Sequence, residues 1–153
     1  MPLYTDTPGI SMQVSRDVVV ASIQVDLDDD VLARFRDDLL HRIHETSSRG
    51  VILDVSGLET LDSNEFAALR RIITMSTIMG AESVLVGLRP GVVSALIEAG
   101  ADVDGLRAAI NLDAAFALLQ PEPEPESEAG TDADVDPEDD LPPESEQTTG
   151  DEQ

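Results

Sequence analysis

The stretch Val51-Ile-Leu-Asp-Val-Ser-Gly-Leu-Glu-Thr-Leu-Asp-Ser-Asn-Glu-Phe66 is the one from which we interpret the rest of the chain. Residues 51–55 are apolar apart from one Asp, which fits a buried strand, and the following Ser-Gly pair fits a turn. A helix is expected to begin at Asp62-Ser63, because Asp62 and Glu65 have the spacing of an N-cap residue and its partner. Apolar residues then recur at helical spacing: Phe66, Leu69, Ile72, Ile73 and Met79.

This helix would place Ser63 on its first turn, close to solvent. The positive end of the helix dipole and the free backbone N–H groups of a first turn can hold a phosphate. No general base lies in the same stretch to activate the serine as a nucleophile. The pattern therefore favours a site of modification over a catalytic site.

Upstream of this stretch, the sequence predicts two strands and a helix. Residues 10–16 alternate apolar and polar side chains, and the run Val18–Val25 is rich in β-branched residues, so the two fit a pair of strands. Within the acidic run Asp26–Asp30, Asp28 or Asp29 is expected to cap a helix; a metal site is the alternative, but the EF-hand pattern is absent. The helix, from Val31 to about Thr46, carries its apolar face on Leu32, Phe35, Leu39 and Ile43.

Two histidines on that helix, His41 and His44, raise the question of a metal site. They are three residues apart, without the four-residue spacing and intervening Glu of metallopeptidase helices, so we expect surface histidines and no metal ligands. Gly50 is expected to end the helix in a left-handed conformation.

Downstream, strand and helix patterns continue to alternate. Residues 83–88 fit a third buried strand, and Pro90 fits the first turn of a helix that ends at Gly100. The apolar face of this helix is expected to comprise Val92, Val93, Leu96 and Ile97. Residues 106–110 fit a short edge strand, and Asp113 is expected to cap a last helix through Leu119. The fold class predicted is α/β, with helices packed against a mixed, mostly parallel sheet.

Composition divides the chain into three parts. Residues 1–9 are expected to be a flexible N-terminus, residues 10–120 one domain, and residues 121–153 a disordered acidic tail. The tail contains 14 of the 32 acidic residues, no basic residue and no aromatic residue, so it cannot bury enough apolar surface to fold. It begins with alternating prolines, which favour an extended spacer.

Charge and cysteine content narrow the possible functions. Without the tail the chain has 18 acidic and nine basic residues, so nucleic acid and anionic membranes are not expected as partners. The chain has no Cys, which excludes disulfides and thiolate metal sites. No signal-peptide pattern and no long apolar run is present, so we expect a cytoplasmic protein.

Several short motifs together resemble the STAS domain of anti-sigma-factor antagonists. They are Ser22-Ile-Gln-Val-Asp-Leu-Asp-Asp29, Val51-Ile-Leu-Asp54, Leu61-Asp-Ser63, Ile73-Thr-Met-Ser76 with Met79-Gly-Ala81, and Leu96-Ile-Glu98 with Gly100. Within that family they look most like the single-domain stressosome scaffolds of the RsbS type. The resemblance runs from about Val18 to Leu119.

The resemblance implies a phosphorylation-regulated scaffold without enzymatic activity and without a cofactor. Such a scaffold would form a large complex with RsbR-type paralogues, pair as a homodimer, and hold an RsbT-type switch serine/threonine kinase in the general stress response. Phosphorylation of Ser63 by that kinase would release it. The surface around the phosphoacceptor would comprise Asp62, Asn64, Glu65, Ala67, Arg70 and Arg71.

Alternatives remain for the acceptor and for the function. Thr60 is a second candidate acceptor, although a turn residue bonding its own backbone is the simpler interpretation. Ser76, in mid-helix, is expected to bond within its helix. The alternative functions are a free antagonist that binds an anti-sigma kinase directly, a small nucleotide-binding protein, or a transport accessory subunit. The motifs GxxxxGK[ST] and GxGxxG are absent, which argues against nucleotide binding.

Overall fold

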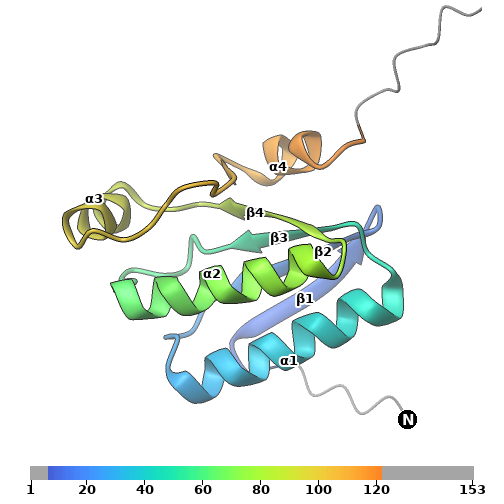
Figure 1. The fold of residues 1–153 in the computed structure, drawn as a ribbon, viewed down its shortest axis with the longest axis horizontal. Coiled ribbons are helices and arrows are strands. Elements are labelled where there is room, and N and C mark those ends of the chain that lie inside the picture. The colour runs from blue at the N-terminus through green and yellow to red at the C-terminus, as the bar shows by residue number, and fades with distance from the viewer. Residues whose placement is uncertain (1–6, 122–153) are drawn as a thin grey trace, which may run out of the picture. The chain divides into compact units, whose positions relative to one another are not determined.

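The computed structural model describes residues 7–121, which form a five-stranded sheet with four helices (Figure 1). The strands are β1 (Ile10–Ser15), β2 (Val18–Ile23), β3 (Gly50–Asp54), β4 (Glu82–Val86) and β5 (Ala108–Ala109). The helices are α1 (Asp29–Thr46), α2 (Ser63–Ile78), α3 (Pro90–Glu98) and α4 (Leu112–Leu118). Residues 1–6 and residues 122–153, which are all but the first residue of the expected tail, lie outside the described residues.

The sheet is mixed and mostly parallel, as predicted. Its strand order is β1-β2-β3-β4-β5; β1 and β2 pair antiparallel, and every other neighbouring pair is parallel. The antiparallel pair is joined at Arg16 and Asp17, which both have positive φ angles (54° and 62°). Each parallel connection passes through a helix, so α1, α2 and α3 link successive strands.

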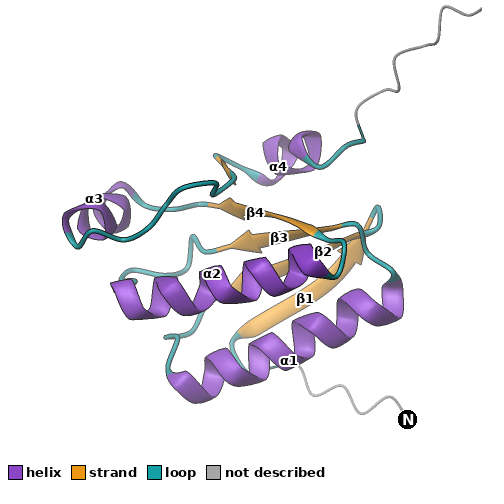
Figure 2. Cartoon of the chain, in the orientation of Figure 1, coloured by secondary structure: helices purple, strands orange, loops and turns teal. Residues whose placement is uncertain are grey.

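The two faces of the sheet are covered unequally. On one face, α1 and α2 pack over the larger core with side chains that include Phe35, Leu39, Phe66 and Leu69. On the other face, α4 covers a smaller core through Ala115 and Leu119. Figure 2 shows α1 and α2 on one side of the strands and α4 on the opposite side.

Local sequence signals explain where the long helices begin. Asp28 caps α1, since its Oδ1 accepts a hydrogen bond of 2.8 Å from the Val31 amide. This confirms the capping role expected for the acidic run. The four residues expected on the apolar face of α1 are all buried. Pro90 occupies the first turn of α3, where its missing N–H leaves no bond unmade.

Two expectations about helix ends were wrong. Ser47, with φ of 50°, ends α1, and Gly50 is instead the first residue of β3. Asn111 caps α4 by accepting a 2.8 Å hydrogen bond from the Ala114 amide, while Asp113 lies in the first turn.

The packed part of the chain extends to Thr7, before the expected domain boundary at residue 10. Thr7 is buried, and its hydroxyl donates a 2.6 Å hydrogen bond to Asp38 on α1. Among residues 7–121, no helix has the length and apolar character needed to cross a membrane.

Candidate functional site

The connection from β3 to α2 is fixed by short-range hydrogen bonds and two buried leucines. The carboxylate of Asp54 accepts hydrogen bonds from the Ser56 amide (3.0 Å) and hydroxyl (2.7 Å), which closes the turn after β3. Leu58 and Leu61 are buried in the larger core. These anchors hold the segment that leads into the first turn of α2.

A capping box defines the start of α2. Asp62 Oδ1 accepts a hydrogen bond of 2.8 Å from the Glu65 amide, and Glu65 Oε2 accepts one of 2.9 Å from the Asp62 amide. Both bonds confirm the expected capping roles of these two residues. The register of the helix, and hence the position of Ser63 on its first turn, follows from them.

Ser63 and Asn64 are both exposed on this first turn. Within the described part of the chain, neither the Ser63 hydroxyl nor the amide N–H groups of these two residues form a hydrogen bond. The first N–H groups of a helix have no partner inside the helix and can bind an anion. The side chain of Ser63 is thus accessible to a modifying enzyme.

The other residues expected around Ser63 follow it along α2. Ala67 and Arg71 are exposed, whereas Arg70 is partly buried. The guanidinium of Arg70 donates to the backbone carbonyls of Asp102 and Asp104 and forms a 2.7 Å ion pair with the Asp102 carboxylate. Arg70 therefore already binds the segment after α3, and Arg71 is the more accessible of the two arginines.

The contact with Arg70 also changes the acidity of Asp102. The hydrogen bond from Arg70 is the main cause that lowers the pKa of Asp102, and a hydrogen bond from the Asp104 amide adds to it. Both interactions favour the ionised carboxylate. Asp102 is thus a stable acceptor for Arg70 at neutral pH.

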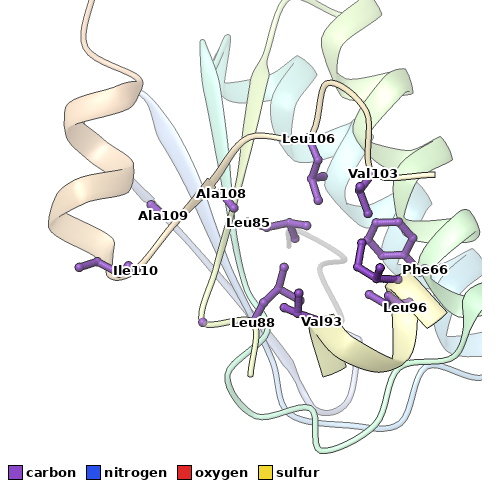
Figure 3. A pocket seen from close by; sticks show the side chains of 12 residues that line it. Phe66, Leu85, Leu88, Val93, Leu96, Val103, Leu106, Ala108, Ala109 and Ile110 are labelled. Atoms are coloured by element: carbon purple, nitrogen blue, oxygen red, sulfur yellow. The ribbon is translucent and has the colours of Figure 1, made fainter. Parts of the chain in front are cut away.

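An apolar cavity of about 520 Å³ is lined in part by Phe66, three residues after Ser63 on α2. Figure 3 shows Phe66 of α2, Leu96 of α3 and Val103 on one side of this cavity, with Ala109 and Ile110 on the other. Three residues of its lining are unusually exposed for their type: Val93 at 41%, Ile97 at 56% and Ile110 at 87%. We call this the α3 cavity. An exposed apolar surface of this kind is typical of an interaction site.

The sequence did not indicate the α3 cavity. Val93 and Ile97 were expected on the buried face of α3, but only Val92 and Leu96 of that set are buried. The apolar stripe on α3 is therefore wider than its contact with the sheet. This extra width of the apolar stripe was the feature of the sequence that could have indicated the α3 cavity.

The other hydroxyls differ in accessibility. Thr60 is exposed and forms no hydrogen bond within the described residues, so it does not bond its own backbone as the simpler interpretation expected. Ser76 is fully buried, and its hydroxyl donates a 3.0 Å hydrogen bond to the Ile72 carbonyl, as expected. Of the three hydroxyls considered as phosphoacceptors, only those of Ser63 and Thr60 are accessible.

Histidine and acidic side chains do not gather into a metal site in the described residues. His41 lies 3.3 Å from Glu45 on the exposed surface of α1. Within residues 7–121 no group of three His, Asp or Glu side chains is placed to hold a metal ion.

Comparisons with known proteins agree with this fold. The STAS domain family model matches residues 9–105. A serine-to-glutamate variant of RsbS from Moorella thermoacetica is 30% identical, with a TM-score of 0.62, and the match covers 72% of this chain and 93% of that one. A chain of the stressosome, described as a signal integration and transduction hub, is 31% identical with a TM-score of 0.63, covering 71% and 95%.

A more distant solved structure shares the fold alone. The anti-sigma factor antagonist SpoIIAA in its unphosphorylated form is 14% identical with a TM-score of 0.52, and the match covers 68% of this chain and 90% of that one. No curated protein matches the sequence. The family model spans more than half of the chain. This chain belongs to the STAS domain family, with a fold like that of stressosome and anti-sigma-factor-antagonist proteins.

Proposed function

We propose that this STAS domain is a stressosome scaffold of the RsbS type, which sequesters an RsbT-type switch kinase and releases it when Ser63 is phosphorylated. The observation that carries the proposal is the exposed Ser63 hydroxyl on the capped first turn of α2, beside the open α3 cavity. The protein would act as a kinase substrate and binding platform in the general stress response. It would have no enzymatic activity of its own.

The domain itself should tolerate a phosphate on Ser63. The group would lie at the positive end of α2, near amide N–H groups that have no partner within the described residues. A helix N-terminus stabilises an anion by its dipole and by such N–H groups. Phosphorylation is therefore expected to leave the fold intact.

A docked partner should not tolerate the same phosphate. Phosphorylation adds about −1.5 to −2 charge at pH 7, next to the carboxylates of Asp62 and Glu65. Burying that charge without a cationic partner costs several kcal/mol, which lowers the affinity of the domain for its partner by orders of magnitude. Arg70 is already bound to Asp102, so it offers limited compensation.

The accessible surface around Ser63 combines polar and apolar parts. Asn64, Ala67 and Arg71 are exposed on α2, and the α3 cavity adds apolar side chains that are available to a partner. Interfaces of this type place an apolar centre inside a polar rim. We infer that the kinase docks over the start of α2 and the α3 cavity.

The proposal is tested by a pull-down, which measures how much kinase is recovered with the tagged domain. The domain is compared with Ser63 intact, with Ser63→Ala and with Ser63→Asp, and Ser11→Asp on β1 serves as an exposed control. We expect the kinase to be recovered with the native, Ser63→Ala and Ser11→Asp proteins and lost with Ser63→Asp. Equal recovery by all four would refute the switch. Repeating the experiment with Thr60→Asp tests the alternative acceptor.

Particle mass separates the scaffold from a free antagonist. A scaffold mixed with its RsbR-type paralogue should elute as a particle of megadalton size, whereas a free antagonist should remain a monomer or homodimer. Light scattering after size-exclusion chromatography measures this difference directly.

A further inference from the structure

The two edges of the sheet differ in how well they are protected from pairing with a further strand. β5 forms one edge with only two residues, whereas β1 forms the other with six, from Ile10 to Ser15 (Figure 1). Soluble proteins usually protect an edge strand by shortness, a charged side chain, a proline or a bulge. β1 has none of these, because its six residues are uncharged, include no proline and pair with β2 in an unbroken register. Within residues 7–121 no strand pairs with its outer side.

The hairpin of β1 and β2 determines which backbone groups of β1 face outward. In an antiparallel pair, alternate residues direct both their N–H and their C=O toward the neighbouring strand, and the residues between them direct theirs away. The Gln24 amide donates to the Gly9 carbonyl at 2.9 Å, so Gly9 and every second residue after it face β2. The backbone groups of Ile10, Met12 and Val14 therefore face the free edge.

Two of these three residues keep both of their outward groups free. The Ile10 N–H is already used, because it donates to the Thr7 carbonyl at 2.9 Å and closes the turn before β1. Within the described part of the chain, no residue bonds to the outward N–H and C=O groups of Met12 and Val14. The edge thus presents two donors and two acceptors at these residues, which is the pattern that another strand can pair with.

Charge favours a second copy of this chain as that strand. Residues 1–120 contain twice as many acidic as basic residues, so two copies repel each other over most of their surface. β1 and β2 carry no charged side chain, so two copies can meet there without bringing carboxylates together. A neutral edge also offers no charge that would select a strongly acidic or basic partner in preference to the chain itself.

The free groups also select one register for such a pair. With a two-fold axis at Gln13, Met12 of one copy lies opposite Val14 of the other, and each of the two Met12–Val14 pairs exchanges two hydrogen bonds. These bonds use every free N–H and C=O of Met12 and Val14. An axis at Met12 would instead need the Ile10 N–H, which Thr7 already holds, and would leave the Val14 C=O unpaired.

We propose that two copies of this chain pair antiparallel along β1, about a two-fold axis at Gln13, so that their two sheets join into one. Val14, which is 41% exposed in a single copy, then packs beside Met12 of the other copy. On the opposite face, Ser11 of one copy lies across from Ser15 of the other. The pairing does not depend on the role of Ser63.

Crosslinking tests the register. The chain has no Cys, so an introduced thiol can react only with its counterpart in another copy. Gln13 would face itself in a pair without hydrogen bonds, where the Cα atoms are about 4.5 Å apart, within the range that a disulfide spans. We expect full-length Gln13→Cys to form a disulfide-linked dimer under mild oxidation, whereas Ser94→Cys, on the exposed surface of α3, does not. A mixture of Ser11→Cys and Ser15→Cys should crosslink more than either variant alone.

Sedimentation of the full-length protein over a series of concentrations tests the affinity of the pair. Gln13→Lys places two ammonium groups opposite each other at the axis and should raise the dissociation constant of the dimer by at least about tenfold. Ser94→Lys is the matched control and should not weaken the dimer. Either lysine lowers the net negative charge, which by itself favours association, so weaker pairing of Gln13→Lys points to β1. Circular dichroism verifies that both variants fold.

Three outcomes would overturn the pairing: a native protein that sediments as a monomer at every concentration, equal crosslinking of Gln13→Cys and Ser94→Cys, or equal dissociation constants for Gln13→Lys and Ser94→Lys. None of them bears on the Ser63 switch. We expect a single copy to bind the kinase, so Ser11→Asp should retain the kinase in the recovery experiment whether or not the copies pair.

Discussion

The guanidinium of Arg70 on α2 forms a 2.7 Å ion pair with the carboxylate of Asp102, 32 residues later in the chain. Arg70 also donates to the Asp104 carbonyl at 2.7 Å. These bonds fasten the segment between α3 and β5 to the helix that begins with Ser63. Leu106 in that segment lines the α3 cavity and also a second cavity, of about 340 Å³, beside α2 and the start of β4.

Removing the arginine should loosen this segment. In Arg70→Gln the ion pair and the bonds to the Asp102 and Asp104 carbonyls are lost, so the amides of residues 101–107 should exchange hydrogen several times faster, as expected for a locally less stable segment. Hydrogen exchange followed by mass spectrometry measures the change. Arg71→Gln, the exposed neighbour, is the matched control and should leave exchange there unchanged. Equal exchange in both variants would contradict a fastening role for Arg70.

The same pair predicts a pH dependence of stability. The pKa of Asp102 is lower in the folded state, mainly because of the Arg70 hydrogen bond, so ionised Asp102 favours folding. Its contribution is present above the unfolded pKa and is lost as pH falls through the folded pKa. Urea unfolding should therefore show Asp102→Asn less stable than native protein at neutral pH, with the difference disappearing in acid. A difference independent of pH would exclude this carboxylate as its source.

Asp62→Ala tests the cap of α2. It removes the bond to the Glu65 amide and the capping box, and loss of an N-cap side chain costs about 1 kcal/mol of unfolding free energy. Asp37→Ala is the control, because Asp37 is an exposed residue inside α1 and its loss should change stability by less than about 0.5 kcal/mol. Chemical denaturation of both variants measures the difference. Equal stabilities would mean that the cap contributes nothing.

Two glycines should respond to alanine in opposite directions. A Cβ on Gly50 would lie 2.9 Å from Leu119 Cδ1 and 3.3 Å from Val18 Cγ2, so Gly50→Ala should destabilise the domain by about 1–3 kcal/mol through overpacking. A Cβ on Gly91 of α3 would point into open space, with no atom of the described residues within 4 Å, so alanine there should be neutral or stabilise by up to about 1 kcal/mol. Melting temperatures of the two variants distinguish these effects.

The features that could be predicted from the sequence are those whose partners lie nearby in the chain. Asp28 and Asp62 each cap a helix through an amide three residues away. The Asp62–Glu65 spacing located the start of α2, and the acidic run narrowed the cap of α1 to Asp28 or Asp29. The helical period likewise identified the buried face of α1. These local signals, repeated along the chain, were sufficient to predict a mixed α/β sheet.

Features that depend on distant residues could not be predicted in this way. Gly50 is a glycine in a strand because Leu119, almost 70 residues later, packs against it. Likewise, no spacing rule links Arg70 to Asp102. The position of Ser63 on the first turn of α2 could be predicted because the Asp62 cap fixes it. The α3 cavity could not be predicted, because it depends on how α3 packs against the segment before β5.

The central claim is that phosphorylation of Ser63 releases the switch kinase, and calorimetric titration tests it most directly. The kinase is titrated with three forms of the domain: phosphorylated at Ser63, unphosphorylated, and Ser63→Ala. We expect the last two to bind alike and phosphorylation to raise the dissociation constant by at least about 100-fold, because an uncompensated charge would be buried. Circular dichroism should show the same folded domain in all three samples. Undiminished binding by the phosphorylated, folded domain would contradict the claim.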